Sequence, residues 1–184
     1  MPTSLFPVLA LEVFRVGPAG LGLLAAAPAI GAFLGALLSG WVSVVRRVGR
    51  AVVLAVVIWG LAITAFGLAT FFFPLALIFL AIAGAADVLS AVFRSTVVQL
   101  ATPDPLRGRV TALHILAVTS GPRIGDIEAA AVAAVVGAQA SVVSGGILCL
   151  LGAAAVTRLF PELGAHLVER PASILDEVGN EKPA

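Results

Sequence analysis

The sequence predicts an all-α integral membrane protein, and three observations predict it. Of the 184 residues, 60% are hydrophobic and 11% are charged, whereas ordinary soluble domains carry roughly 25% charged residues. The mean hydropathy is +1.13. Several uncharged runs also exceed the roughly 18 residues that mark a helix long enough to cross a bilayer. A soluble helical bundle of this size could not hide so much apolar surface, so it is the weaker alternative.

Hydrophobic segments follow one another along the chain. The first, residues 3–14, is too short to cross a hydrocarbon core of roughly 30 Å at about 1.5 Å per residue, so we interpret it as the end of a spanning helix. Five further segments are long enough to span, and their expected bounds are 20–45, 51–69, 75–101, 106–136 and 141–160. Residues 1–161 are therefore expected to form one transmembrane bundle. The polar residues 162–184 are expected to be a disordered cytoplasmic tail.

Small residues and helix breakers indicate where these segments pack closely and where they are interrupted. The second segment has a small residue at every fourth position, at Ala27, Gly31, Gly35 and Ser39. Such a stripe lies on one helix face and lets helices approach closely in lipid. Gly121 and Pro122 are expected to interrupt the fifth segment, as a simple kink or as a break that lines a cavity, because proline removes a backbone donor. Residues 137–140 are expected to form the turn that follows.

Arginine is distributed unevenly among the turns. One set of alternate turns is rich in arginine, whereas the other set carries Arg15 alone. Because cytoplasmic loops are enriched in Lys and Arg, we expect the arginine-rich turns and both ends of the chain on the cytoplasmic side. These turns are expected to anchor the protein at the lipid headgroups or, alternatively, to make gating contacts with neighbouring helix ends. Their candidate residues are Arg46, Arg47, Gly49, Arg50, Arg107, Gly108 and Arg109.

Ionisable residues inside apolar helices are the main functional candidates, because such groups are costly in lipid and need a partner, water or a task. They are Asp87, Arg94, Arg123, Asp126 and Glu128. The first two are seven residues apart and share a helix face. Arg123 and Asp126 are three apart and can meet directly, whereas Glu128 lies roughly 140° round the helix from Arg123 and is expected to face elsewhere. The five residues line a polar or proton pathway, or they neutralise one another between helices. For any single residue the second interpretation is favoured.

Several classes of function find no support in the sequence. There is no nucleotide-binding loop and no nucleophile with a positioned base, so we expect no enzyme activity. The single cysteine, Cys149, and the lack of metal-ligand spacing predict neither a disulfide within the chain nor a metal site, and no cofactor is expected. A net charge of +1 gives no electrostatic reason to expect nucleic acid as a partner.

Three stretches resemble the C-terminal half of a major facilitator superfamily (MFS) transporter. Residues 102–110, Thr-Pro-Asp-Pro-Leu-Arg-Gly-Arg-Val, are similar to the cytoplasmic turn between helices ten and eleven of many bacterial members. Residues 39–50 resemble the basic turn between helices eight and nine. Residues 83–96, together with 121–126, are similar to the exporter branch that includes the enterobactin (siderophore) exporters.

This resemblance implies a six-helix half of the fold with its first helix truncated, in a bacterial inner membrane. Its partners would be the lipid bilayer, a small-molecule substrate and a missing N-terminal half of six helices. The implied activity is efflux of a siderophore or drug, coupled to protons, by alternating access. The five ionisable residues would line or brace the path. The alternatives are a truncated structural fragment that transports nothing, or a half-transporter that must dimerise.

Overall fold

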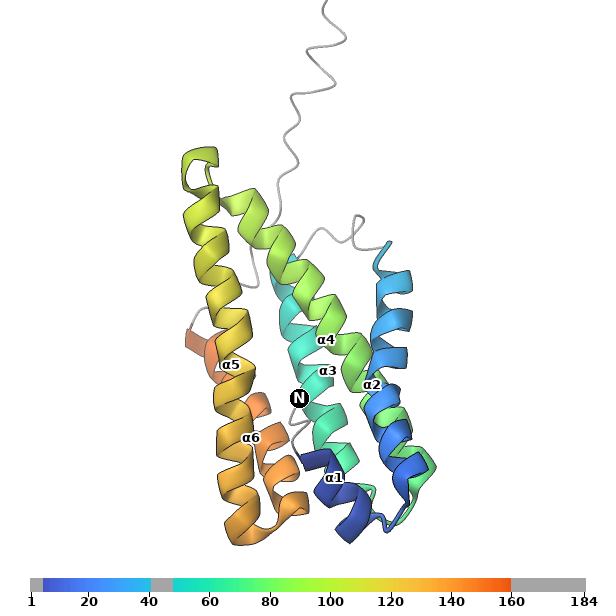
Figure 1. Ribbon diagram of the computed structural model, residues 1–184. Helices are drawn as coiled ribbons and strands as arrows, with labels where there is room; N and C mark the ends of the chain where they lie inside the picture. The colour runs from blue at the N-terminus through green and yellow to red at the C-terminus, as the bar shows by residue number, and fades with distance from the viewer. Residues whose placement is uncertain (1–4, 41–47, 160–184) are drawn as a thin grey trace, which may run out of the picture.

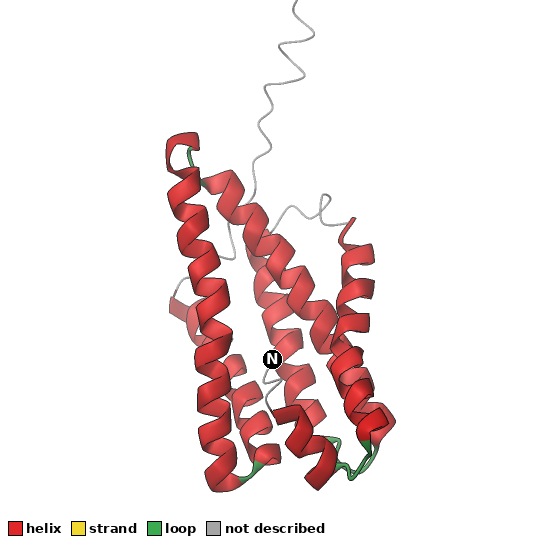
Figure 2. Cartoon of the chain, in the orientation of Figure 1, coloured by secondary structure: helices red, strands yellow, loops and turns green. Residues whose placement is uncertain are grey.

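A computed structural model describes residues 5–40 and 48–159 of the chain, and in these ranges all regular structure is helical (Figures 1 and 2). The elements in order are α1 (Phe6–Val8), η2 (Leu9–Val13), α2 (Pro18–Leu38), α3 (Val48–Leu68), α4 (Phe73–Ala101), η4 (Asp104–Leu106), α5 (Arg107–Val136) and α6 (Ala138–Leu159). Within the described ranges, α2, α3, α4 and α6 are long and apolar enough to cross a membrane. Five full spans were expected, and α5 is the one that does not meet this criterion, because charged side chains interrupt its apolar sequence.

The long helices pack as neighbours in the order α2, α4, α3, α6, α5. Consecutive helices α4 and α5 touch little and diverge from the η4 turn that joins them (Figure 1). The short N-terminal elements α1 and η2 lie at the opposite end of the bundle, beside the turns that follow α3 and α5 (Figure 1). The architecture is therefore a helical bundle in which α5 is attached mainly through α6.

The helix boundaries follow local chemistry. Pro18 and Pro74 occupy the first turns of α2 and α4, where the missing N–H of proline costs nothing and its fixed φ suits a helix. The π-helical element η2 ends at Val13, and Arg15, two residues later, adopts a left-handed φ of 52°. The N–H of Val16 then donates to the carbonyl of Ala10 at 2.8 Å. This turn reverses the chain into α2.

Two sequence expectations about α5 need correction. The break considered at Gly121 and Pro122 is absent, because the helix is continuous there; a proline removes a single hydrogen bond, and the turns on either side can hold the helix together. The alternative of a simple kink stays a prediction. The expected turn at residues 137–140 shrinks to Gly137, and α6 begins at Ala138. Gly137 has φ +92°, a conformation that glycine adopts without steric cost, so a single residue reverses the chain.

Glycines set the closest helix contacts. A Cβ atom added to Gly31 of α2 would overlap the backbone of Ala81 on α4, and one added to Gly84 of α4 would overlap the carbonyl of Pro28 on α2. A Cβ added to Gly35 would lie 2.8 Å from the Ala85 carbonyl oxygen. The small-residue stripe predicted on α2 is thus confirmed as the face that packs on α4, with backbone against backbone.

Glycine also allows the backbones of α3 and α6 to approach closely. A Cβ added to Gly146 of α6 would lie 2.9 Å from the backbone nitrogen of Thr64 and 3.0 Å from the Gly60 carbonyl oxygen on α3. The hydroxyl of Thr64 donates to that same Gly60 carbonyl at 2.8 Å. Two separate helix pairs therefore depend on glycine for their spacing.

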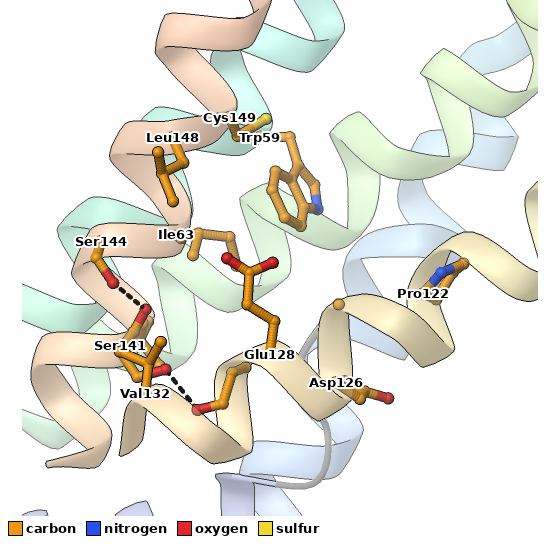
Figure 3. A pocket seen from close by; sticks show the side chains of 14 residues that line it. Trp59, Ile63, Pro122, Asp126, Glu128, Val132, Ser141, Ser144, Leu148 and Cys149 are labelled. Carbon is orange, nitrogen blue, oxygen red and sulfur yellow. Dashed lines mark hydrogen bonds between the residues drawn. The ribbon is translucent and has the colours of Figure 1, made fainter. Parts of the chain in front are cut away.

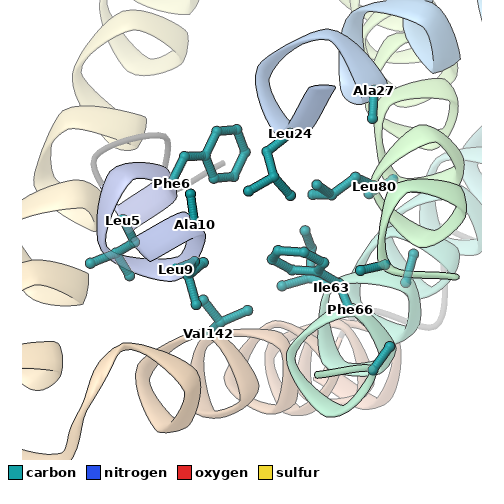
Figure 4. Close-up of a cluster of buried hydrophobic side chains, with 14 of the residues drawn as sticks. Leu5, Phe6, Leu9, Ala10, Leu24, Ala27, Ile63, Phe66, Leu80 and Val142 are labelled. Carbon is teal, nitrogen blue, oxygen red and sulfur yellow. The ribbon is translucent and has the colours of Figure 1, made fainter. Parts of the chain in front are cut away.

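The hydrophobic core gathers where the N-terminal elements meet the bundle (Figure 4). The four largest of its almost fully buried side chains each come from a different element: Leu9, Leu24, Phe66 and Leu80. The ring of Phe14 adds to this packing and lies 6.0 Å from Phe66 and 5.4 Å from Phe73, centroid to centroid. The short first segment, which comprises α1, η2 and Phe14, therefore closes one end of the bundle, where it packs against α2, α3, α4 and α6.

Candidate functional site

Asp87 and Arg94 lie on one face of α4, as their spacing predicts. Leu80 is seven residues before Asp87, so it shares that face, and Leu80 is completely buried in the core. Asp87 and Arg94 are both exposed. Arg94 donates from Nε to the carbonyl of Ser90 on its own helix, at 3.3 Å. Asp87 and Arg94 are thus exposed beside a buried stripe of α4 that continues through Ala86, Ser90 and Phe93.

Arg123 and Asp126 do not meet. Arg123 is exposed and Asp126 is half-buried, and no ion pair joins any two of the five ionisable candidates in the described part of the chain. The direct contact that their spacing allows is therefore not made. At three residues apart, the two side chains share a helix face only approximately.

Glu128 occupies a different environment from Arg123, as expected from its angle. It lines a cavity of about 280 Å³ between α3, α5 and α6 (Figure 3). Trp59 and Ile63 of α3 form one wall, residues 122–132 of α5 form the second, and residues 141–149 of α6 form the third. The Glu128 carboxylate points into this space, toward Ile63 and Trp59, whereas the Asp126 side chain points away from Glu128 (Figure 3). The sequence offered a polar pathway for the five ionisable residues as a set, but it did not indicate which helices would surround Glu128.

The polar groups of the cavity are few and specific. The indole Nε1 of Trp59 is buried and has no hydrogen-bond partner. The Ser141 hydroxyl donates to the carbonyl of Ala129 at 2.8 Å, and the Ser144 hydroxyl to the carbonyl of Ser141 at 2.9 Å. None of the lining residues is Lys, Arg or His, so the charged residues of the lining, Asp126 and Glu128, are both acidic. The rest of the surface is apolar or glycine.

Trp59 is the residue that sequence reasoning missed. It lies near the middle of α3, whereas tryptophan in membrane proteins concentrates at the two interfaces. A tryptophan in mid-span was the available signal that a polar N–H would need a place inside the bundle. Ser144 and Cys149 of α6 line the same cavity. The sequence did not mark them as site residues, because small and weakly polar residues are common in membrane helices.

The arginine-rich positions gather at one end of the bundle. Arg50, Arg107, Gly108 and Arg109 are exposed in the first turns of α3 and α5, and Gly49 is half-buried at the start of α3. Both helices begin toward the same end of the bundle, and α5 begins at the η4 turn (Figure 1). These residues belong to helix ends and not to the turns in which they were placed. Arg46 and Arg47 lie outside the described residues.

Comparison with known proteins gives one match. A family model described as transmembrane secretion effector, of the MFS type, matches residues 2–171. No match to a curated protein or to a solved structure was found. The matched range includes every described helix, and therefore both the charged face of α4 and the cavity beside Trp59.

Proposed function

We propose that this chain, which belongs to the transmembrane secretion effector family of MFS-type transporters, carries a small organic molecule out of the cell by alternating access. Family membership identifies the chain as a multi-pass membrane transport protein and points away from an enzyme. The direction, the coupling to protons and the siderophore or drug as cargo are the proposed parts.

The observation that supports this proposal best is the pair of exposed charges on one face of α4. Where the N-terminal elements cover this face, it carries the fully buried Leu80. Two and four turns further on, the same face carries Asp87 and Arg94, both exposed. Charged groups at membrane depth need water or a partner. An open charged face in mid-bundle therefore suits a water-filled path better than a lipid-facing surface.

The weak attachment of α5 supports a further part of the proposal. No residue of α5 is buried, and α4 and α5 diverge from their common turn (Figure 1). A second bundle of six helices, or a second copy of this chain, would cover these surfaces and complete the path. In transporters built from two halves, the substrate site lies between the halves near the midplane.

Orientation in the membrane is proposed from the arginines. Arg50 and Arg109 lie at one end of the bundle, and Arg15 lies at the other. The positive-inside bias places the arginine-rich end in the cytoplasm of a bacterial inner membrane. The N-terminal elements α1 and η2 then lie toward the other side of the membrane. A carrier of this orientation would take its cargo from the side on which α5 begins.

The experiment measures export from cells that express the gene at its full genomic length. Catecholate siderophore in the medium and retention of a drug-like dye are followed with and without an uncoupler that collapses the proton gradient. Asp87→Asn and Arg94→Gln are expected to lower uncoupler-sensitive export strongly. Glu12→Gln, an exposed change at the opposite end of the bundle, is the matched control.

Two results would count against the proposal. Normal export by both Asp87→Asn and Asp126→Asn would remove the proton-coupling role of these carboxylates. Export that persists unchanged when the gene is deleted, for both the siderophore and the dye, would leave only the structural role in a membrane assembly.

A further inference from the structure

We infer that the cavity between α3, α5 and α6 is a binding site for a small organic cation with an apolar or aromatic body. The residues that define it are Trp59, Ile63, Glu128, Gly145 and Leu148. This inference deepens the drug alternative of the proposed function, on which it rests for the idea that the bound molecule is cargo. Binding itself needs no transport, so the two can be tested separately.

The size of the cavity sets the scale of the ligand. Its volume of about 280 Å³ falls near the lower end of the roughly 300–1,000 Å³ typical of pockets for small molecules. Glu128 is exposed although it points inward, so the cavity is open to a ligand that arrives from outside the bundle. A small molecule, and not a large macrocycle, matches this space.

The charge of the cavity sets the sign of the ligand. Glu128 projects into the cavity and Asp126 lies at its edge, and no lining residue is basic. An anion would meet two carboxylates with nothing to offset them, whereas an ammonium group would be attracted to Glu128.

The indole of Trp59 indicates which apolar part of the ligand would bind beside the ammonium group. Its Nε1 is buried below the cavity surface, so the ligand meets the ring and not the N–H. The face of the indole attracts cations, and Ile63 and Leu148 provide apolar surface on either side. An aromatic ammonium compound uses all of these groups together.

Glycine provides the means to test the site without changing its charge. A Cβ added to Gly145, which lines the cavity, would meet no atom within 4 Å, and the same holds for Gly152, seven residues further along α6. Both glycines are exposed and share a helix face. Gly145→Leu is therefore expected to fill the cavity, whereas Gly152→Leu adds the same side chain outside it.

The experiment titrates the purified full chain, in detergent or nanodiscs, with benzyltrimethylammonium, and measures affinity by calorimetry. Fluorescence of Trp59 in a Trp41→Phe background reports whether binding occurs at this cavity. Saturable binding that changes Trp59 fluorescence is expected. Glu128→Gln should weaken the affinity by about tenfold or more, as loss of a charged interaction does, and Gly145→Leu should abolish binding. Gly152→Leu and Glu12→Gln should bind like the unmodified chain.

Several outcomes would overturn the inference. Equal binding by the Glu128→Gln variant and the unmodified chain, or binding of phenylacetate as tight as that of the cation, would show that charge does not select the ligand. Binding that survives Gly145→Leu would place the site elsewhere. Size-exclusion profiles identify misfolded variants, and because Glu128→Gln and Gly145→Leu act independently, either folded variant is sufficient for the test. If the purified chain binds the cation at this cavity but the cells export neither the siderophore nor the dye, the binding site is supported and the transport proposal is wrong.

Discussion

The Ser141 hydroxyl on α6 donates a hydrogen bond of 2.8 Å to the backbone carbonyl of Ala129 on α5 (Figure 3). The side-chain hydrogen bonds of Thr64, Thr96 and Thr119 return instead to carbonyls of their own helices. This contact therefore joins two helices, one of which, α5, buries no residue in the bundle. It forms one edge of the cavity into which Glu128 points.

Removal of the Ser141 hydroxyl is expected to loosen α5. Ser141→Ala deletes the link between the helices and should cost about 1 kcal/mol, the typical value for one net hydrogen bond. The loss should appear as faster hydrogen–deuterium exchange in residues 122–136, with α2 and α4 unchanged. Ser144→Ala is the control, because its hydroxyl bonds within α6. Equal exchange in both variants would contradict the proposed importance of the Ser141 contact.

The contact of α2 with α4 is expected to be intolerant of a single methyl group. Gly31→Ala places a Cβ against the Ala81 backbone, which cannot move as a flexible side chain would. We expect a loss of about 1–3 kcal/mol in the free energy of unfolding, the usual cost of overpacking. Unfolding in a detergent or denaturant series measures it.

The matched control for this change is on the same helix. Gly22 is exposed, and a Cβ added there would meet nothing within 4 Å. Gly22→Ala should therefore leave stability unchanged or raise it by up to about 1 kcal/mol through helix propensity. If the two alanine variants unfold alike, the close approach of α2 and α4 does not determine stability.

Pro122 is expected to be unfavourable for α5 and not required for its path. The helix is continuous across this residue, so Pro122→Ala restores a backbone donor without altering the fold. Stability should rise, by up to about 3 kcal/mol, and exchange in α5 should slow. A fall in stability would show that proline sets a kink on which the packing of α5 against α6 depends.

The proposed orientation predicts opposite labelling patterns at the two ends of the bundle. In a Cys149→Ala background, Arg15→Cys should react with a membrane-impermeant maleimide added outside intact cells. Arg50→Cys and Arg109→Cys should react only after the membrane is permeabilised. All three positions are exposed, so access depends on the side of the membrane and not on burial. The reverse pattern would invert the proposed topology.

Much of the fold was predictable from periodicity and composition. Four of the five expected spans are helices apolar enough to cross a membrane, and the stripe that includes Gly31 and Gly35 does pack on α4. These features are local or depend on spacing along one helix, which a sequence displays directly. The ends of α5 and α6 were harder to place, because the conformation of Gly137 allows one residue to replace the expected turn of four.

The candidate site was predictable only in part. The sequence alone determined that the chain is a helical membrane protein, that Asp87 and Arg94 share a helix face, and that Glu128 is turned away from Arg123, since each depends on helix geometry and apolar length. Only the tertiary structure decided that Arg123 and Asp126 remain apart, that Glu128 faces Trp59, and that the first segment covers Leu80 but leaves Asp87 open. The physical reason is that contacts between helices depend on how far each helix extends beyond its neighbour, and the sequence of a single helix does not record this.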